Sequence, residues 1–293
     1  MLKYDYEIAD AIELKNAQKG ERQQMISGPI GVFDSGLGGL TTLKELLKLL
    51  PGEDIIYLGD TGRVPYGLKS KETIIKYALQ DAAFLTGFNI KAMVVACNSV
   101  CSSAYDVLKD RFDIPIYEVI SPSVKAAALC SKNKKIGVIG TKATIRSGAY
   151  TAYLKKELAD AQIYSAACPL FVPLVEEGVV APDDIAALSI AERYLGDLRE
   201  SGIDCLILAC THYPLLKKVI SKVIGETVTL IDSGMETAKL VANDIQSGII
   251  AKSGKTDGEI KYFVTDSTDG FVAMASKFLG CDIRGMVKQV ELE

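Results

Sequence analysis

Two cysteines stand where a short apolar run of the sequence ends and polar residues begin. Cys97 closes the run MVVAC and is followed by Asn98 and Ser99, and Cys210 closes LILAC and is followed by Thr211 and the chain's single histidine, His212. A thiolate can act as a base or a nucleophile, and a nearby imidazole can stabilise it or relay its proton. Because a free cysteine is also a common inert core residue, a structural role stays open for each cysteine taken alone.

The segment DSGLGG, which starts at Asp34 and Ser35, is predicted to be a loop between a strand and a helix. Its glycines allow a sharp turn, and amide N–H groups at a helix start can hold an anion. A dinucleotide-binding fingerprint is the alternative, since Asp60 follows at about the expected 20 residues, but Thr41 stands where its third glycine belongs. A carboxylate beside a pyrophosphate is unfavourable, so Asp34 favours an anion or amino-acid loop over a dinucleotide.

Two further segments are weaker candidates. The turn-rich run GRVPYG contains Tyr66 and Gly67 and could line a cleft, although an ordinary surface loop fits it as well. Glu176 and Glu177 follow the run CPLFVPLV, and such a pair of acids is usually solvated.

Metal and hydrolase chemistry fit the cysteines less well. Cys97 and Cys101 are spaced C-x3-C, and Cys205 lies inside a predicted strand, whereas structural zinc commonly uses short knuckles such as C-x2-C. A Cys–His–Asp hydrolase would leave the second strand-end cysteine unexplained. We therefore expect no metal.

Short apolar runs alternate with helix-period segments along most of the chain. The pattern predicts an α/β fold with mostly parallel sheets. In such sheets, ligands bind at the carboxyl ends of the strands. Two pairs of similar segments, which we call echoes, place reactive side chains at such ends. They are MVVACN with LILACT, and FDSG with IDSG. The predicted strands are Ile30–Phe33, Asp54–Leu58, Ala92–Ala96, Ile114–Val119, Lys135–Ile139, Ile163–Ala166, Asp204–Ala209, Thr227–Ile231 and Glu259–Val264, and two predicted helices are Leu40–Leu50 and Glu72–Thr86.

A length of 293 residues suggests two domains. Proline disfavours helix in the residue before it, so a hinge is expected near Ile120-Ser121-Pro122, and the chain is expected to return near Asp232. The predicted division is an N-terminal extension at 1–24, a first α/β domain at 25–121 plus 233–293, and a second similar α/β domain at 122–232. Two similar halves facing each other would bring Cys97 and Cys210 to one cleft.

Composition excludes several classes of protein. The net charge is −4 with no basic cluster, so we expect no direct nucleic-acid binding. The apolar runs are strand-length, so no membrane span is expected, and the mixed-charge N-terminus is not a secretory signal. Seven cysteines, an odd number, indicate reduced thiols in a cytoplasmic protein.

Taken together, the segments IGVFDSGLGGL, GRVPYG, VVACNS, IGVIGTKAT, CPLFVPLVE, ACTHYPLL and LIDSG resemble glutamate racemase, in the family's order and over nearly all the chain from Ile30. The resemblance implies two α/β domains with the active site between them. It also implies interconversion of L- and D-glutamate with no cofactor, neither pyridoxal phosphate nor metal.

The resemblance also assigns roles to residues. Cys97 takes the proton from D-glutamate with help from Asp34, and Cys210 takes it from L-glutamate with help from His212 and Glu176. The substrate-binding residues are placed at Asp34 with Ser35, Tyr66 with Gly67, Asn98 with Ser99, Thr141 with Thr144, and Thr211 with His212.

The family's biology adds further expectations. The product supplies peptidoglycan synthesis, and so cell-wall biogenesis and cell shape, in bacteria. Members form homodimers, and some interact with DNA gyrase, an interaction for which this sequence carries no support. The alternatives are an aspartate or other amino-acid racemase of the same superfamily, or a non-catalytic amino-acid-binding or gyrase-interacting protein. His212 favours glutamate, because the aspartate enzymes usually carry an acid there.

Three segments of the chain depart from the family pattern. Ser99 replaces the usual threonine but keeps the hydroxyl, and Ala209 replaces a glycine. The run Ile120-Ser121-Pro122-Ser123 replaces Ile-Glu-Pro-Ala, which bears on the hinge more than on the chemistry.

Overall fold

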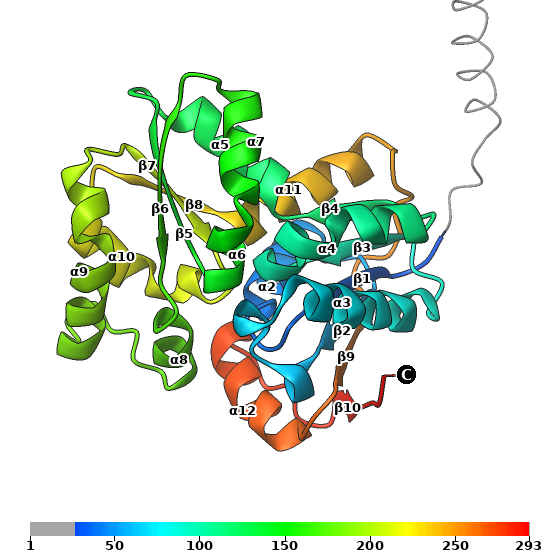
Figure 1. Ribbon diagram of the computed structural model, residues 1–293. Helices are drawn as coiled ribbons and strands as arrows, with labels where there is room; N and C mark the ends of the chain where they lie inside the picture. The colour runs from blue at the N-terminus through cyan, green and yellow to red at the C-terminus, as the bar shows by residue number, and fades with distance from the viewer. Residues whose placement is uncertain (1–26, 293) are drawn as a thin grey trace, which may run out of the picture.

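The structure, a computed structural model, describes residues 27–292 and contains two parallel β-sheets, each with helices on both faces (Figure 1). The larger sheet has six strands in the order β10-β9-β2-β1-β3-β4. All of its strand pairs are parallel. Its strands are β1 (Ile30–Asp34), β2 (Ile55–Gly59), β3 (Ala92–Val95), β4 (Ile116–Glu118), β9 (Ile260–Val264) and β10 (Val287–Gln289).

The smaller sheet has four parallel strands in the order β6-β5-β7-β8. They are β5 (Lys135–Gly140), β6 (Gln162–Ala167), β7 (Cys205–Ala209) and β8 (Thr229–Asp232). We call the larger sheet with its helices the first lobe and the smaller sheet with its helices the second lobe.

Helices bury both faces of each sheet, which explains the unbroken apolar runs of the central strands. In the first lobe, α2 (Leu40–Leu49), α11 (Ser233–Gln246) and α12 (Thr268–Leu279) cover one face and α3 (Lys71–Thr86) and α4 (Asn98–Arg111) the other. In the second lobe, α8 (Phe171–Glu176), α9 (Ile185–Glu200) and α10 (Lys217–Ile224) lie opposite α5 (Ile120–Cys130), α6 (Lys142–Ser147) and α7 (Ala149–Glu157). The short 3₁₀ helices are η1 (Thr61–Arg63), η2 (Tyr66–Leu68) and η3 (Tyr213–Leu216).

All nine strands predicted from the sequence are confirmed, with ends that shift by a few residues, as are the two predicted helices. The sequence missed β10, because two of its three residues, VKQ, are polar and the strand lies on an edge of the sheet. The α/β fold with parallel sheets is therefore confirmed.

Ile120–Pro122 form the first turn of α5, so the proline does not keep the preceding residue out of a helix, and the hinge near these residues stays a prediction. Proline is tolerated there, since its missing N–H would have no partner within the helix. The buried Glu118 carboxylate accepts hydrogen bonds from the backbone N–H groups of Ile120 and Ser121 instead.

The chain crosses between the lobes at two helices. α5 follows β4 of the first sheet and packs on β7 and β8 of the second, and α11 follows β8 and packs on α2 of the first lobe. The domain limits at 121/122 and 232/233 remain a prediction, and the proposed extension at 1–24 lies outside the described residues. Within 27–292, no helix combines the length and apolar character needed to cross a membrane.

Candidate active site

Both cysteines lie directly after a central strand of their sheet. Cys97 follows β3 and precedes α4, and Cys210 follows β7 and precedes η3. Each is only 5% exposed. The two thiols lie close enough that a charge on Cys97 raises the pKa of Cys210. The structure therefore brings the two strand-end cysteines, 113 residues apart in sequence, to one place between the lobes.

Burial keeps both thiols protonated. It raises the pKa of Cys97 to about 11, and the neighbouring Asp34 carboxylate raises it further, while the Ser35 hydroxyl, 3.5 Å from the sulfur, opposes the shift. Burial also raises the pKa of Cys210 strongly, and the backbone N–H groups of His212 and Tyr213 offset only part of that rise. A thiolate in this closed site therefore needs a base or a cation beside it.

Asp34 is fully buried at the end of β1. Its Oδ2 accepts a hydrogen bond from Gly36 N at 3.0 Å, and its Oδ1 accepts one from the Thr211 hydroxyl of the other lobe at 3.4 Å. Burial raises the pKa of Asp34, whereas the charge of His212 lowers it. A buried carboxyl with a raised pKa, near a thiol, is a candidate to exchange a proton with it.

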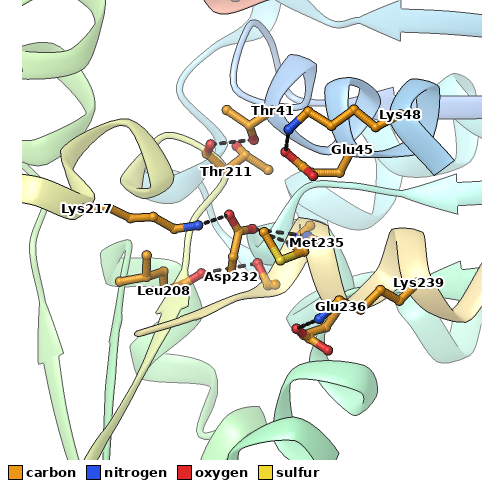
Figure 2. Close-up of polar contacts among 12 residues, drawn as sticks. Thr41, Glu45, Lys48, Leu208, Thr211, Lys217, Asp232, Met235, Glu236 and Lys239 are labelled. Carbon is orange, nitrogen blue, oxygen red and sulfur yellow. Dashed lines mark hydrogen bonds and ion pairs between the residues drawn. The ribbon is translucent and has the colours of Figure 1, made fainter. Parts of the chain in front are cut away.

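The glycine loop packs directly on the second cysteine segment. A Cβ on Gly38 would lie 2.1 Å from the Thr211 hydroxyl and 2.5 Å from His212 Nδ1, so only glycine fits. Thr41, the residue that breaks the dinucleotide fingerprint, donates its hydroxyl to the Thr211 carbonyl at 2.8 Å (Figure 2). The loop thus joins the two lobes beside the thiols.

His212 faces an acid of the second lobe. Its Nε2 lies 3.0 Å from Glu176 Oε1, at the end of α8. The His212 ring also meets the Phe278 ring edge-on, with the two ring centroids 6.4 Å apart. Of the two neighbouring acids, Glu176 is therefore the one that contacts His212.

The hydroxyl groups of Ser99, Thr141 and Thr144 meet where the two lobes face each other. Ser99 Oγ lies 3.0 Å from Thr141 Oγ1 and 3.3 Å from Thr144 Oγ1. Gly67 packs against the same Thr141, whose Cβ would be 2.7 Å from a Cβ on the glycine. These residues, at the starts of α4 and α6 and in η2, converge on one polar wall.

Two of the candidate side chains turn away to protein partners. The buried Tyr66 hydroxyl bonds to Asp60 and, at 3.1 Å, to Asp81. Asp60 is itself fully buried and also bonded to Arg63 and Thr265, so it is not available for a ribose, which removes the dinucleotide alternative.

Asn98 is likewise occupied. Its Oδ1 accepts from Tyr150 at 2.6 Å and its Nδ2 donates to Ser233 at 3.2 Å. Tyr66 and Asn98 are thus left with their backbone groups for any ligand.

Sequence reasoning missed Ser233 and Tyr150. The IDSG echo of FDSG was a signal for the first, and the echo extends to structure: Asp34 accepts from Gly36 N and Asp232 from Gly234 N, each at 3.0 Å. Figure 2 also shows Asp232 paired with Lys217. Nothing in the sequence marks Tyr150.

No zinc site is formed by these cysteines. Within residues 27–292, no three His, Cys, Asp or Glu side chains are grouped as a metal ion would require.

Comparison with known proteins gives a consistent result. The model of the family described as Asp/Glu/Hydantoin racemase matches residues 35–241. The glutamate racemase of Geobacter metallireducens is 48% identical over 264 residues, which is 90% of this chain and 97% of that protein.

Solved structures agree. Glutamate racemase isoform RacE1 from Bacillus anthracis superposes with a TM-score of 0.87 at 37% identity, covering 91% of this chain and 98% of that one. The glutamate racemase of Francisella tularensis in complex with D-glutamate superposes with a TM-score of 0.83 at 38% identity, with the same coverage. With a family model spanning more than half its length and relatives matched over almost their whole chains, this protein belongs to the Asp/Glu/Hydantoin racemase family.

Proposed function

We propose that this enzyme interconverts L- and D-glutamate by proton transfer between two cysteines, without a cofactor. The observation that carries the proposal is the convergence of Cys97 and Cys210, each at the end of a central strand of its own lobe. The glutamate racemases to which the chain is similar, including one in complex with D-glutamate, support glutamate as the substrate.

The reaction balances with the two thiols alone. With L-glutamate bound, the Cys210 thiolate takes the α-proton, the C–H electron pair stays on Cα, and the Cys97 thiol gives a proton to the opposite face. Cys97 ends as the thiolate, ready to take the proton of D-glutamate in the reverse direction. No electron leaves or enters, so no redox partner is needed.

Removal of the α-proton is the costly step, because it leaves a carbanion whose energy the site must lower by electrostatic stabilisation. The α-carboxylate fits the N-terminal N–H groups of α4 beside Cys97, with Ser35, Ser99 and Thr211 as further donors. The substrate ammonium would place a positive charge near thiols whose pKa burial has raised, and so favour the thiolate.

Two helper groups complete the scheme. Asp34 exchanges a proton with Cys97, and His212, held by Glu176, does so with Cys210. Thr141 and Thr144 join Ser99 in binding the substrate, and Tyr66 and Gly67 position the loop opposite them.

Because Cys97, Cys210 and Asp34 are buried, the lobes must separate for the substrate to enter. We propose that they do so as the domains 25–121 with 233–293 and 122–232.

In the cell, we propose that D-glutamate from this reaction feeds peptidoglycan synthesis and that the enzyme acts in the cytoplasm as a homodimer. An interaction with DNA gyrase is a separate question that a pull-down would answer.

A direct assay tests the proposed function. Protein treated with a chelator and free of added pyridoxal phosphate is incubated with L-glutamate, and in parallel with L-aspartate, while optical rotation is followed. Decay of the glutamate rotation to zero is expected, with little change for aspartate. A stable glutamate rotation with folded protein would contradict the proposal.

A further inference from the structure

A chain of three side-chain hydrogen bonds runs between the lobes next to the two cysteines. The Tyr150 hydroxyl on α7 donates to Asn98 Oδ1 at 2.6 Å. Asn98 Nδ2 on α4 donates to Ser233 Oγ at 3.2 Å. The Ser233 hydroxyl, at the start of α11, donates to the Leu208 carbonyl of β7 at 3.1 Å.

Two members of this chain adjoin the two thiols. Asn98 immediately follows Cys97, and Leu208, on β7, stands two residues before Cys210, which follows that strand. The two bonds through Ser233 therefore link the segment after Cys97 to the strand before Cys210, and the Tyr150 bond holds the Asn98 side chain that makes this link.

The chain lies wholly in the interior. The four residues are between 0% and 3% exposed. The Tyr150 hydroxyl also lies near Ser123 and Ser233, which adds to its local hydrogen bonding. Away from water, a polar group without a partner is costly, so these groups hold one another in a single arrangement.

Positional precision matters for a reaction of this type. Proton transfer on opposite faces of one carbon requires both sulfurs at fixed distances from it, and a misplacement of about 1 Å can cost about 100-fold in rate. Neither Ser233 nor Tyr150 contacts either thiol through a hydrogen bond in this chain, so any effect they have passes through Asn98 and β7.

We propose that Ser233 and Tyr150 are positioning residues for the racemisation, which set the separation of Cys97 and Cys210 by holding the Asn98 side chain. This inference rests on the proposed function and goes beyond it, because it assigns a catalytic consequence to two residues of the lobe junction.

The test compares matched single-hydroxyl deletions. Tyr150→Phe and Ser233→Ala remove the hydroxyl groups of the chain and keep the rest of each side chain. The controls are Tyr117→Phe and Ser276→Ala, which each remove one hydrogen-bonded, partly buried hydroxyl away from the chain. The Tyr117 hydroxyl bonds to Asp244 at 2.7 Å, and the Ser276 hydroxyl bonds within α12 at 2.9 Å. Steady-state racemisation in both directions and thermal unfolding are measured for each.

For both chain variants, we expect kcat to fall about 10- to 100-fold in each direction with KM changed less than about threefold. The controls should stay within about twofold of the parent. The double variant should lose little more than the worse single one, since both act through Asn98.

The inference is overturned if the folded chain variants keep the kcat of the controls, or if their losses multiply in the double variant. Near-ultraviolet circular dichroism establishes that each variant is folded, and Tyr150→Phe keeps the ring that fills the core. The parent protein is the reference: if it does not racemise glutamate, the proposed function fails, whereas an active parent with unaffected variants refutes this inference alone.

Discussion

His212, two residues after Cys210, forms a polar contact with Glu176 in which Nε2 and Oε1 lie 3.0 Å apart. With Glu176 ionised, Nε2 carries the proton and Nδ1 is left as the acceptor on the side of Gly38. The acid thus selects the tautomer and the orientation of the only imidazole in the chain.

Glu176→Gln should slow the removal of the proton from L-glutamate. An amide can no longer hold the imidazole in one tautomer, so we expect kcat from L- to D-glutamate to fall about 10- to 100-fold. Glu177→Gln, at the next residue, is the matched control, because the hydrogen bond to His212 comes from Glu176. Equal kinetics for the two variants would remove Glu176 from the mechanism.

Gly38→Ala should abolish most activity while the protein stays folded. The added Cβ would lie 2.1 Å from the Thr211 hydroxyl and must push the Thr211–His212 segment away from Asp34. Gly270→Ala in α12 meets no atom within 4 Å and should be neutral or slightly stabilising, by up to about 1 kcal/mol. A fully active Gly38→Ala protein would show that the lobes need not close as they do here.

The alkylation rate of Cys97 should keep rising with pH. Its pKa is raised to about 11, so at pH 8 only about one thiol in a thousand is ionised. Below that pKa the rate should increase about tenfold per pH unit, whereas an ordinary thiol levels off near 8.5. Peptide-resolved mass spectrometry after iodoacetamide pulses, with exposed Cys281 as internal reference, measures this. A plateau for Cys97 near pH 8.5 would contradict the assigned shift.

Glu53→Gln should lower stability without altering the site. Glu53 forms a buried ion pair with Lys91, whose side chain is 1% exposed and also bonds to the Ala251 carbonyl. Removing the carboxylate leaves a buried ammonium without its counter-charge, which costs about 3–5 kcal/mol.

The exposed pair Glu45–Lys48 supplies the control, and Glu45→Gln should cost less than about 1 kcal/mol (Figure 2). Urea unfolding monitored by circular dichroism gives both values. Similar midpoints for the two variants would mean that the Lys91 pair contributes no more than a surface contact.

Much of the fold was predictable, because its strands are apolar on both faces and end at polar residues. The same feature located Cys97 and Cys210, since each lies where such a run stops. Spacing could not reveal which side chains meet across the lobes. The contact of Gly38 with Thr211 joins segments that are 173 residues apart in sequence.

Other features depended on tertiary partners in a similar way. Pro122 reads as a helix breaker, but Glu118 supplies the hydrogen bonds that let α5 begin before it. Tyr150 occupies an ordinary helical position, and only its tertiary contact with Asn98 gives its hydroxyl a role there.

The exchange of the α-proton with solvent tests the two-thiol account most directly. The protein is incubated with L-glutamate in D₂O, and the two enantiomers are separated early in the reaction and analysed for α-deuterium. The account predicts that the D-glutamate formed carries deuterium while the remaining L-glutamate is still mostly protiated, and that Cys97→Ala and Cys210→Ala each abolish racemisation. Undeuterated D-glutamate, or a fully active variant lacking either cysteine, would contradict it.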